Sequence, residues 1–314
     1  MDVKNKIKLQ FDDIFFEEEI RCDYKISTEK KKIWAVELDL LNELIRVCEK
    51  HDIKMCLSCG ALLGAIRHKG MIPWDDDIDV SLSRAEYEKL CKVAQQEFKH
   101  PYFFQTYKTD PQYLFGYARL RNSLTTGYIV GMDDPSYNNG IYIDVFVMDG
   151  FIDDAKLLKA QEKEMRKQLR LFDIYNGNYR TGNIKKRIIK KCFYSVLSPF
   201  VRAFYGHNEI VSSYFKCQQQ YNDITDRVAI IDEKLYGIRK NWCKKQDLEE
   251  IIYVPFENLM VPIPSNYNFM LTNAYGNYMA FPPISQRGVW HEGIIEFDPD
   301  TPYNEYLKKS LSKK

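Results

Sequence analysis

The chain of 314 residues lacks any long hydrophobic run. No stretch approaches the roughly 20 apolar residues that a membrane-spanning helix needs. Residues 1–15 carry several charges and no continuous apolar segment, so they do not show the pattern of a secretory signal peptide. From these absences we expect a cytoplasmic protein.

A strong excess of charge of one sign is also missing. The formal net charge is +1, so the molecule as a whole lacks the basic surplus of nucleic-acid-binding domains, and we expect no nucleic-acid partner. The charge is unevenly spread, however, because residues 156–205 hold thirteen Lys and Arg against three acids, an excess of ten positive charges. There is no internal repeat, and the length suits one large domain or two small ones.

A second Cys-x-x-Cys pair is absent. The eight cysteines are scattered, and Cys56 with Cys59 forms the one such pair, which leaves a four-ligand zinc site incomplete. A redox dithiol would lie at the turn of a thioredoxin-like unit, and no other feature indicates that unit. We therefore favour ordinary buried thiols in a reducing cytosol.

The hydrophobic pattern predicts alternating helices and strands. Apolar residues recur at helical spacing across 33–50, and Ser83 with Glu86 forms a capping box at the start of a later helix. Residues 1–30 are polar and predict a loosely held lead-in. Further elements are expected as strands at 53–57, 75–82, 102–107, 115–120, 125–130 and 141–147, helices at 61–67 and 83–98, a mainly helical basic region at 154–220, a hairpin at 251–254 and 259–263, and a short helix ending at Gly276. This order predicts an α/β or α+β core that a helical insert interrupts.

The densest charge cluster is the run Asp75, Asp76, Asp77 and, after one isoleucine, Asp79. In a β conformation Asp75, Asp77 and Asp79 would point to one face and Asp76 to the other. Carboxylates on one face repel one another unless a cation lies among them, and oxygen ligands suit Mg²⁺ or Mn²⁺. An acidic solvated loop is the alternative, but the apolar residues on both sides of the run argue against it. We therefore predict a metal site here.

A further acid, Asp144, lies inside an otherwise apolar strand. A buried carboxylate must be paired or must bind metal, because burying it alone is costly. Asp144 is therefore either a third ligand beside Asp77 and Asp79, or the ion-pair partner of an arginine such as Arg119 or Arg121.

Gly60 stands at the expected N-terminus of the helix at 61–67. Free backbone N–H groups and the helix dipole suit a phosphate oxygen there, and a plain turn glycine is the alternative. Arg67, His68 and Lys69 lie between this helix and the acids, where they either neutralise phosphate charge during transfer or form a solvated loop. Together, the turn, the basic groups and a metal held by carboxylates describe phosphoryl-type transfer.

The sequence SCGALLGAIRHKGMIPWDDDID, residues 58–79, resembles the signature of LicD-type phosphocholine transferases, whose core the fukutin-type enzymes share. The resemblance covers about residues 25–290, with further matches at Lys31–Glu49, Arg119–Ser123, Gly140–Gly150, Tyr275–Tyr278 and Pro282-Pro283. The chain departs from the family pattern where Cys59-Gly60-Ala61 replaces the usual Gly-Gly-Thr or Gly-Gly-Ser. That change removes a hydroxyl from the expected phosphate-binding turn and leaves backbone contacts.

The resemblance implies a nucleotidyltransferase-like mixed sheet with a helical, basic insert. It also implies transfer of a phospho-alcohol from a CDP-linked donor, CDP-choline in LicD itself, to a sugar hydroxyl of a teichoic acid or lipopolysaccharide precursor. Carried over by motif, Asp77 and Asp79 would hold Mg²⁺ or Mn²⁺, Asp144 would be the third carboxylate and Asp75 a supporting acid. The donor phosphates would lie at Gly60, Ala61, Arg67, His68 and Lys69. The expected segments are a lead-in at 1–30, a catalytic core at 31–150, a mainly helical basic region at 151–250 and a C-terminal segment at 251–314 that completes the core.

Two other functions stay open on the sequence. One is a nucleotidyltransferase that makes the nucleotide-linked donor, and the other is a non-catalytic glycan- or membrane-binding protein that retains the fold. Residues 180–205 mix cationic and apolar side chains, which suits peripheral contact with an anionic membrane at its inner face, and a lipid-linked acceptor would make that contact useful. The alternative for this segment is a solvated helix packed on the core.

Overall fold

A mixed sheet of seven strands forms the centre of the computed structural model, which describes residues 3–111, 113–129, 137–177, 184–232, 240–288 and 295–306. The helices are α1 (Thr28–Lys50), α2 (Cys59–Arg67), α3 (Arg84–Glu97), α4 (Ala155–Tyr175), α5 (Ile184–Phe204), α6 (His207–Gln219) and α7 (Tyr267–Tyr275). The strands are β1 (Glu19–Arg21), β2 (Tyr24–Ile26), β3 (Cys56–Leu57), β4 (Asp79–Ser83), β5 (Tyr102–Gln105), β6 (Ala118–Asn122), β7 (Thr126–Ile129), β8 (Ile141–Gly150), β9 (Arg227–Ile230), β10 (Trp242–Lys244), β11 (Ile251–Phe256), β12 (Leu259–Pro264) and β13 (Ile295–Asp298). The expected α/β class is confirmed.

Strand β8 organises the sheet. It pairs in parallel with β4 along one edge and antiparallel with β6 and β9 along the other, while β3, β5 and β10 extend the sheet beyond these neighbours. In the parallel register Asp79, the first residue of β4, lies beside Asp144 of β8. Two acids that are far apart in the sequence therefore meet at one place in the sheet.

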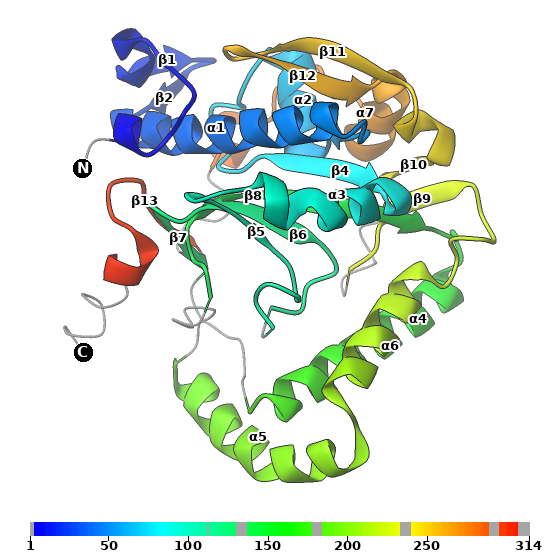
Figure 1. Cartoon of the computed structure of the whole chain (residues 1–314). Coiled ribbons are helices and arrows are strands. Elements are labelled where there is room, and N and C mark those ends of the chain that lie inside the picture. The colour runs from blue at the N-terminus through cyan, green and yellow to red at the C-terminus, as the bar shows by residue number, and fades with distance from the viewer. Residues whose placement is uncertain are drawn as a thin grey trace.

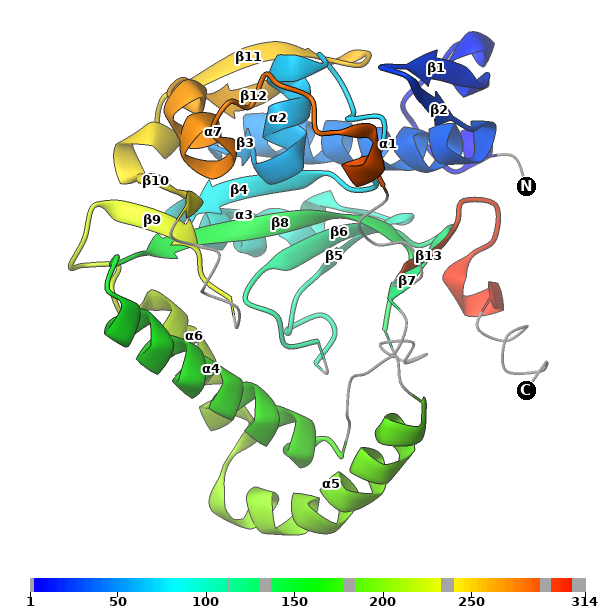
Figure 2. The ribbon, with the colours of Figure 1, turned by 180° about the vertical axis from the view of Figure 1, so that it is seen from behind.

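The main hydrophobic core lies between the sheet and α1. Ser27 caps this helix by accepting a hydrogen bond from the backbone N–H of Lys30 at 3.2 Å, and the buried face of the helix includes Trp34, Leu38 and Leu41. Each such side chain contributes about 1.5–3 kcal/mol when fully buried. Figures 1 and 2 show α1, α2 and the β11–β12 hairpin on one side of the sheet and helices α4–α6 on the other.

The first described residues are packed, so the prediction of a loosely held lead-in is wrong. Strands β1 and β2 form a hairpin, and Val3, Ile7 and Ile26 belong to the main core. Lys6 is buried and donates from Nζ to the carbonyl of Pro299 at 2.9 Å. A few apolar side chains spread along this polar segment pack into the core. The average composition of the segment does not reveal them.

Helices α4–α6 form an arm at the end of the sheet (Figure 1). A second hydrophobic cluster, which includes Phe151, Met165, Phe172, Tyr214 and Ala229, joins α4 and α6 to β8 and β9. Strands β9 and β10 then return the chain to the sheet. Across the described ranges no helix is both long and apolar enough to cross a bilayer.

Candidate active site

The acidic run lies where the chain enters the sheet. Strand β4 begins at Asp79, so Asp75, Asp76 and Asp77 form the loop before it, and the strand predicted from residue 75 starts four residues later. Strand pairing explains the later start of β4. Strand β3 has only two residues, and they pair with Val80 and Ser81 of β4. Carboxylate oxygens of the three loop acids come within 4.8 Å of one another.

A cavity of about 840 Å³ opens beside these acids. Asp75, Asp77 and Asp79 line it, while Asp76 is 6% exposed and is not among the lining residues. The alternation expected for a strand therefore holds in the loop as well. Gly60 and Arg67 of α2 also line the cavity, and the segment Tyr275–Gln286, which follows α7 and passes over α2 in Figure 2, contributes much of its wall.

Like charges dominate the electrostatics of this wall. Burial raises the pKa of Asp79 well above its usual range, and the nearby charges of Asp77, Asp144 and Asp75 raise it further. A cation among these groups would offset both effects. The donor set consists of carboxylate oxygens, which is the chemistry that Mg²⁺ and Mn²⁺ select, so these residues fit the predicted ion.

The sequence left two roles open for Asp144, namely ion-pair partner of an arginine and third metal ligand. Its Oδ1 accepts a hydrogen bond from Nε of Arg119 on β6 at 2.6 Å, and both side chains are buried. The guanidinium carbon of Arg119 lies 4.0 Å from the ring centre of Tyr142. The ion pair is therefore present, and Asp144 still lies beside Asp79 in the sheet. Its role as a third metal ligand stays a prediction.

Sequence reasoning missed Glu37 on α1. It is 0% exposed, and neither of its carboxylate oxygens has a hydrogen-bond partner among the described residues. Burial raises its pKa well above the usual range, and the charges of Asp77 and Asp76 add to the increase. Glu37 thus packs beneath the acidic loop. The sequence did contain one sign that Glu37 is buried. It directly precedes Leu38 and lies within the apolar stripe of α1.

The turn into α2 holds its backbone in an uncommon conformation. Cys59 has a φ of 48°, in the left-handed region that costs a non-glycine residue about 1–3 kcal/mol. Burial raises the pKa of its thiol well above the usual range, and burial also raises the pKa of Cys56 to about 12. Both thiols therefore stay protonated near neutral pH, which agrees with ordinary buried cysteines.

Gly60 provides a test of the cavity wall. A Cβ at this position would collide with Oδ2 of Asp75, whereas one at Gly64 would collide with the backbone carbonyl of Gly70. We expect Gly60→Ala to displace the Asp75 carboxylate and lower turnover about tenfold or more with little change in melting temperature. Gly64→Ala should instead lower the free energy of unfolding by about 1–3 kcal/mol, because backbone cannot move aside. Equal effects of the two variants on stability would contradict this assignment.

The basic residues after α2 have separate roles. Nη1 of Arg67 donates to the carbonyls of Tyr278 and Ala280 at 3.0 and 3.2 Å, so Arg67 fastens the segment that lines the cavity. His68 stacks on Phe281 with ring centres 5.4 Å apart. Burial, together with Arg67 and other arginines, lowers the pKa of His68 to about 4, so it is neutral near pH 7. Of the residues predicted to bind donor phosphate, the structure brings Gly60 and Arg67 to the cavity wall, and it does not bring Ala61, His68 or Lys69 there.

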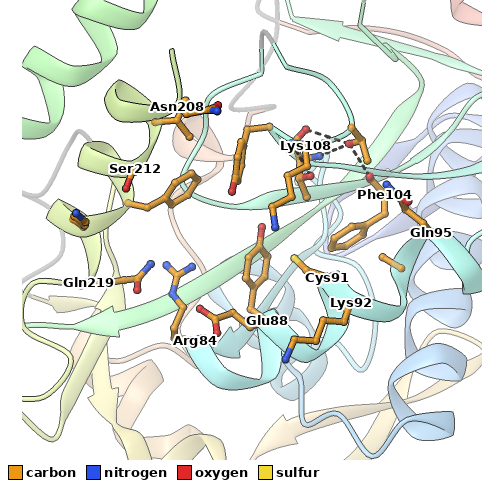
Figure 3. Close-up of a pocket in the computed structure, with 18 residues that line it drawn as sticks. Arg84, Glu88, Cys91, Lys92, Gln95, Phe104, Lys108, Asn208, Ser212 and Gln219 are labelled. Carbon is orange, nitrogen blue, oxygen red and sulfur yellow. Dashed lines mark hydrogen bonds between the residues drawn. The ribbon is translucent and has the colours of Figure 1, made fainter. Parts of the chain in front are cut away.

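A second cavity of about 670 Å³ lies between α3, the segment after β5, and α6 (Figure 3). It has a basic rim that includes Lys92 and Lys108, and Lys108 extends into it in Figure 3. Arg84, which also lines this cavity, forms an ion pair with the buried Asp149. None of the predicted site residues lines this cavity, so we place the chemistry at the acidic one.

Comparison with known proteins defines the class of this site. Residues 52–169, which include α2, the acidic loop, β4 and β8, match the sequence model of the LicD/FKTN/FKRP nucleotidyltransferase domain. The resemblance to the LicD type is therefore confirmed, and it identifies the protein as a transferase enzyme.

One relative matches over most of its length. The lipopolysaccharide cholinephosphotransferase LicD of Haemophilus influenzae is 29% identical over 258 residues, which cover 81% of this chain and 92% of the relative. Uncharacterized proteins of Rickettsia prowazekii and Rickettsia typhi are 35% and 41% identical over 74 and 73 residues. Those matches cover 23% of this chain and 26% and 23% of the two relatives.

Proposed function

We propose that this enzyme transfers phosphocholine from a CDP-linked donor to a sugar hydroxyl of a lipopolysaccharide or teichoic acid type of glycan. The observation that carries the proposal is the cavity of about 840 Å³ in which three carboxylates face an aromatic segment. Its size suits a nucleotide-linked donor together with part of an acceptor. The relative from Haemophilus influenzae is, by its name, a cholinephosphotransferase acting on lipopolysaccharide, which supports the choice of group and acceptor.

In this proposal Asp77 and Asp79 hold Mg²⁺ or Mn²⁺, Asp75 supports them and Asp144 is the third carboxylate. When bound, the ion neutralises part of the donor's diphosphate charge and polarises the phosphorus under attack. The raised pKa of Asp79 supports this assignment, because burial and the charges of Asp77, Asp144 and Asp75 all disfavour its ionised form, and a bound cation would favour that form.

The reaction exchanges the phosphoanhydride bond of the donor for a phosphate ester bond to the acceptor. The acceptor hydroxyl oxygen bonds to the phosphorus that bears choline, the bond from that phosphorus to CMP breaks, and the hydroxyl proton is released. The backbone N–H of Gly60, in the first turn of α2, has no partner within the helix, and it suits a donor phosphate oxygen because Gly60 lines the cavity.

The cavity suits a quaternary ammonium, because its lining includes the aromatic residues Trp74, Tyr275, Tyr278 and Phe281. Two guanidinium groups, of Arg67 and Arg287, already lie 5.3 and 5.4 Å from the ring centre of Phe281. The ring of Tyr275 is 46% exposed, and its pKa is raised by burial of the hydroxyl and by the charges of Cys59 and Asp79. We assign Tyr275 to the choline group, because its ring lies close to the acids and no cation of the described residues lies over it.

The test is product analysis with a panel of donors. The protein with Mg²⁺, CDP-choline and a lipopolysaccharide or teichoic acid acceptor should release CMP and label the glycan, and chelation of the metal should stop both. CDP-ethanolamine, CDP-ribitol and CDP-glycerol should react more slowly, and Tyr275→Leu should reduce the preference for CDP-choline. Pyrophosphate release from CTP and phosphocholine would instead identify a nucleotidyltransferase. Failure of every donor with both acceptors would overturn the proposal.

A further inference from the structure

Helix α5 presents an exposed apolar stripe. Five large hydrophobic side chains, at 54–80% exposure, lie along it: Ile189, Phe193, Val196, Phe200 and Phe204. At 100° per residue these positions fall within about 80° of arc, so they form one continuous strip along the helix. Single exposed hydrophobic residues are common, but a contiguous strip of this length marks an interaction surface.

The helix is fastened to the protein by a different face. Tyr194 and Ser198 are each 6% exposed, and Oγ of Ser198 donates to the carbonyl of Tyr175 at 2.9 Å. Nε of Arg202 donates to the same carbonyl at 2.9 Å. The contacts to α4 therefore leave the apolar stripe in solvent. The other alternative for this segment, a solvated helix packed on the core, agrees with the same contacts, so membrane binding is the property that separates the two.

Cations accompany the stripe. The sequence of α5 contains five basic residues in its first half, one more at Arg202, and no acid. Lys186, Lys190 and Lys191 are exposed. A surface that combines large apolar side chains with a net positive charge is complementary to the headgroup region of an anionic bilayer. Residues 180–183 of the predicted segment lie outside the described ranges.

We propose that α5 docks this protein on an anionic membrane surface, with its apolar stripe at the boundary of headgroups and acyl chains and its lysines on lipid phosphates. Figures 1 and 2 both place α5 at the far end of the arm from α1, where a flat surface can reach it without meeting the sheet. A second copy of the chain fits less well, because two such helices would bring together cations that no acid of α5 offsets. The proposal does not depend on the reaction, since membrane binding is measured without turnover.

Flotation of the full chain with vesicles tests the apolar stripe. Wild-type protein should float with vesicles of phosphatidylcholine and phosphatidylglycerol and far less with phosphatidylcholine alone. The triple variant Phe193→Ser, Phe200→Ser, Phe204→Ser should lower partitioning about tenfold or more. The matched control removes three equally exposed isoleucines elsewhere, Ile14→Ser, Ile20→Ser and Ile224→Ser, at 69–77% exposure, and should bind as wild type.

A second pair of variants tests the charge. The variant Lys186→Gln, Lys190→Gln should lower partitioning roughly 25-fold, because each basic residue near an anionic surface contributes a factor of about five. Its control removes two exposed lysines of α4, Lys156→Gln and Lys159→Gln, with the same change in net charge. Circular dichroism of each variant verifies the fold.

Three outcomes would overturn the proposal. Wild-type protein that fails to bind the anionic vesicles is one, and equal losses in the test and control variants are another. The third is a wild-type dimer in sedimentation velocity that the stripe variant converts to monomer, since that would assign the stripe to a second copy. Because the readout is binding, none of these results bears on whether CDP-choline is the donor.

Discussion

Asp79→Asn is expected to abolish nearly all turnover while making the metal-free protein more stable. The carboxylate is buried among like charges that raise its pKa well above the usual range. Removing its charge removes that repulsion, so the melting temperature without metal should rise by a few degrees. Removing a proposed metal ligand should lower kcat/KM about a thousandfold or more, since charge stabilisation of this kind is worth several kcal/mol in the transition state.

The pH dependence separates this effect from general damage. A carboxyl with a raised folded-state pKa binds its proton more tightly in the folded protein, so stability falls as pH rises from the ordinary aspartate pKa through the folded one. Asp79→Asn should lose that part of the pH dependence in thermal melts. Saturating Mg²⁺ at about 100 times its Kd should stabilise wild type by about 2.7 kcal/mol and the variant much less. Asp223→Asn, at an exposed site, is the control, and turnover of Asp79→Asn within tenfold of wild type would refute the metal assignment.

Local pattern predicted much of the fold. The helix expected at 33–50 is α1, and its true start at Thr28 was missed because residues 28–32 offer no apolar side chain to the helical period, although Ser27 is a good cap. The helix at 83–98 and the strand at 141–147 were found at nearly the observed positions. Strands β1, β2, β9, β10 and β13 were missed, because each has only three or four residues, too few to show a clear period. Strands β9 and β13 also depend on partners far away in the sequence.

The candidate site was predicted in part for a similar reason. Asp75, Asp77 and Asp79 are neighbours in the sequence, so their spacing alone placed them on one face, and the cavity agrees. The aromatic residues of the wall, Tyr275 among them, reach the cavity through tertiary packing, and the buried Glu37 comes near the acidic loop in the same way, which no local period encodes. The motif at 275–278 was recognised as a similarity without a role, because its position over α2 depends on contacts such as that of Arg67 with Tyr278.

Arg119→Met is expected to lower the free energy of unfolding by about 3–5 kcal/mol. The side chains of Arg119 and Asp144 are 5% and 10% exposed, and removal of the arginine leaves a buried carboxylate without its ion-pair partner. Burial alone would lower the pKa of Arg119, but the charge of Asp144 keeps it well above the usual value, which shows how strongly the two groups interact. Urea unfolding measures the loss, and a change below about 1 kcal/mol would contradict it.

The double variant Arg119→Met, Asp144→Leu then separates the two roles of Asp144. Replacing a buried ion pair with apolar side chains is often neutral or stabilising, so this variant should recover most of the lost stability. If Asp144 serves only Arg119, turnover should recover as well. If Asp144 is the third carboxylate of the metal site, the double variant should fold, respond weakly to Mg²⁺ and stay inactive, which is the result we expect. Arg84→Met is the matched control, because it breaks the buried pair with Asp149 away from the acidic cavity and should reduce stability without reducing the turnover of folded protein.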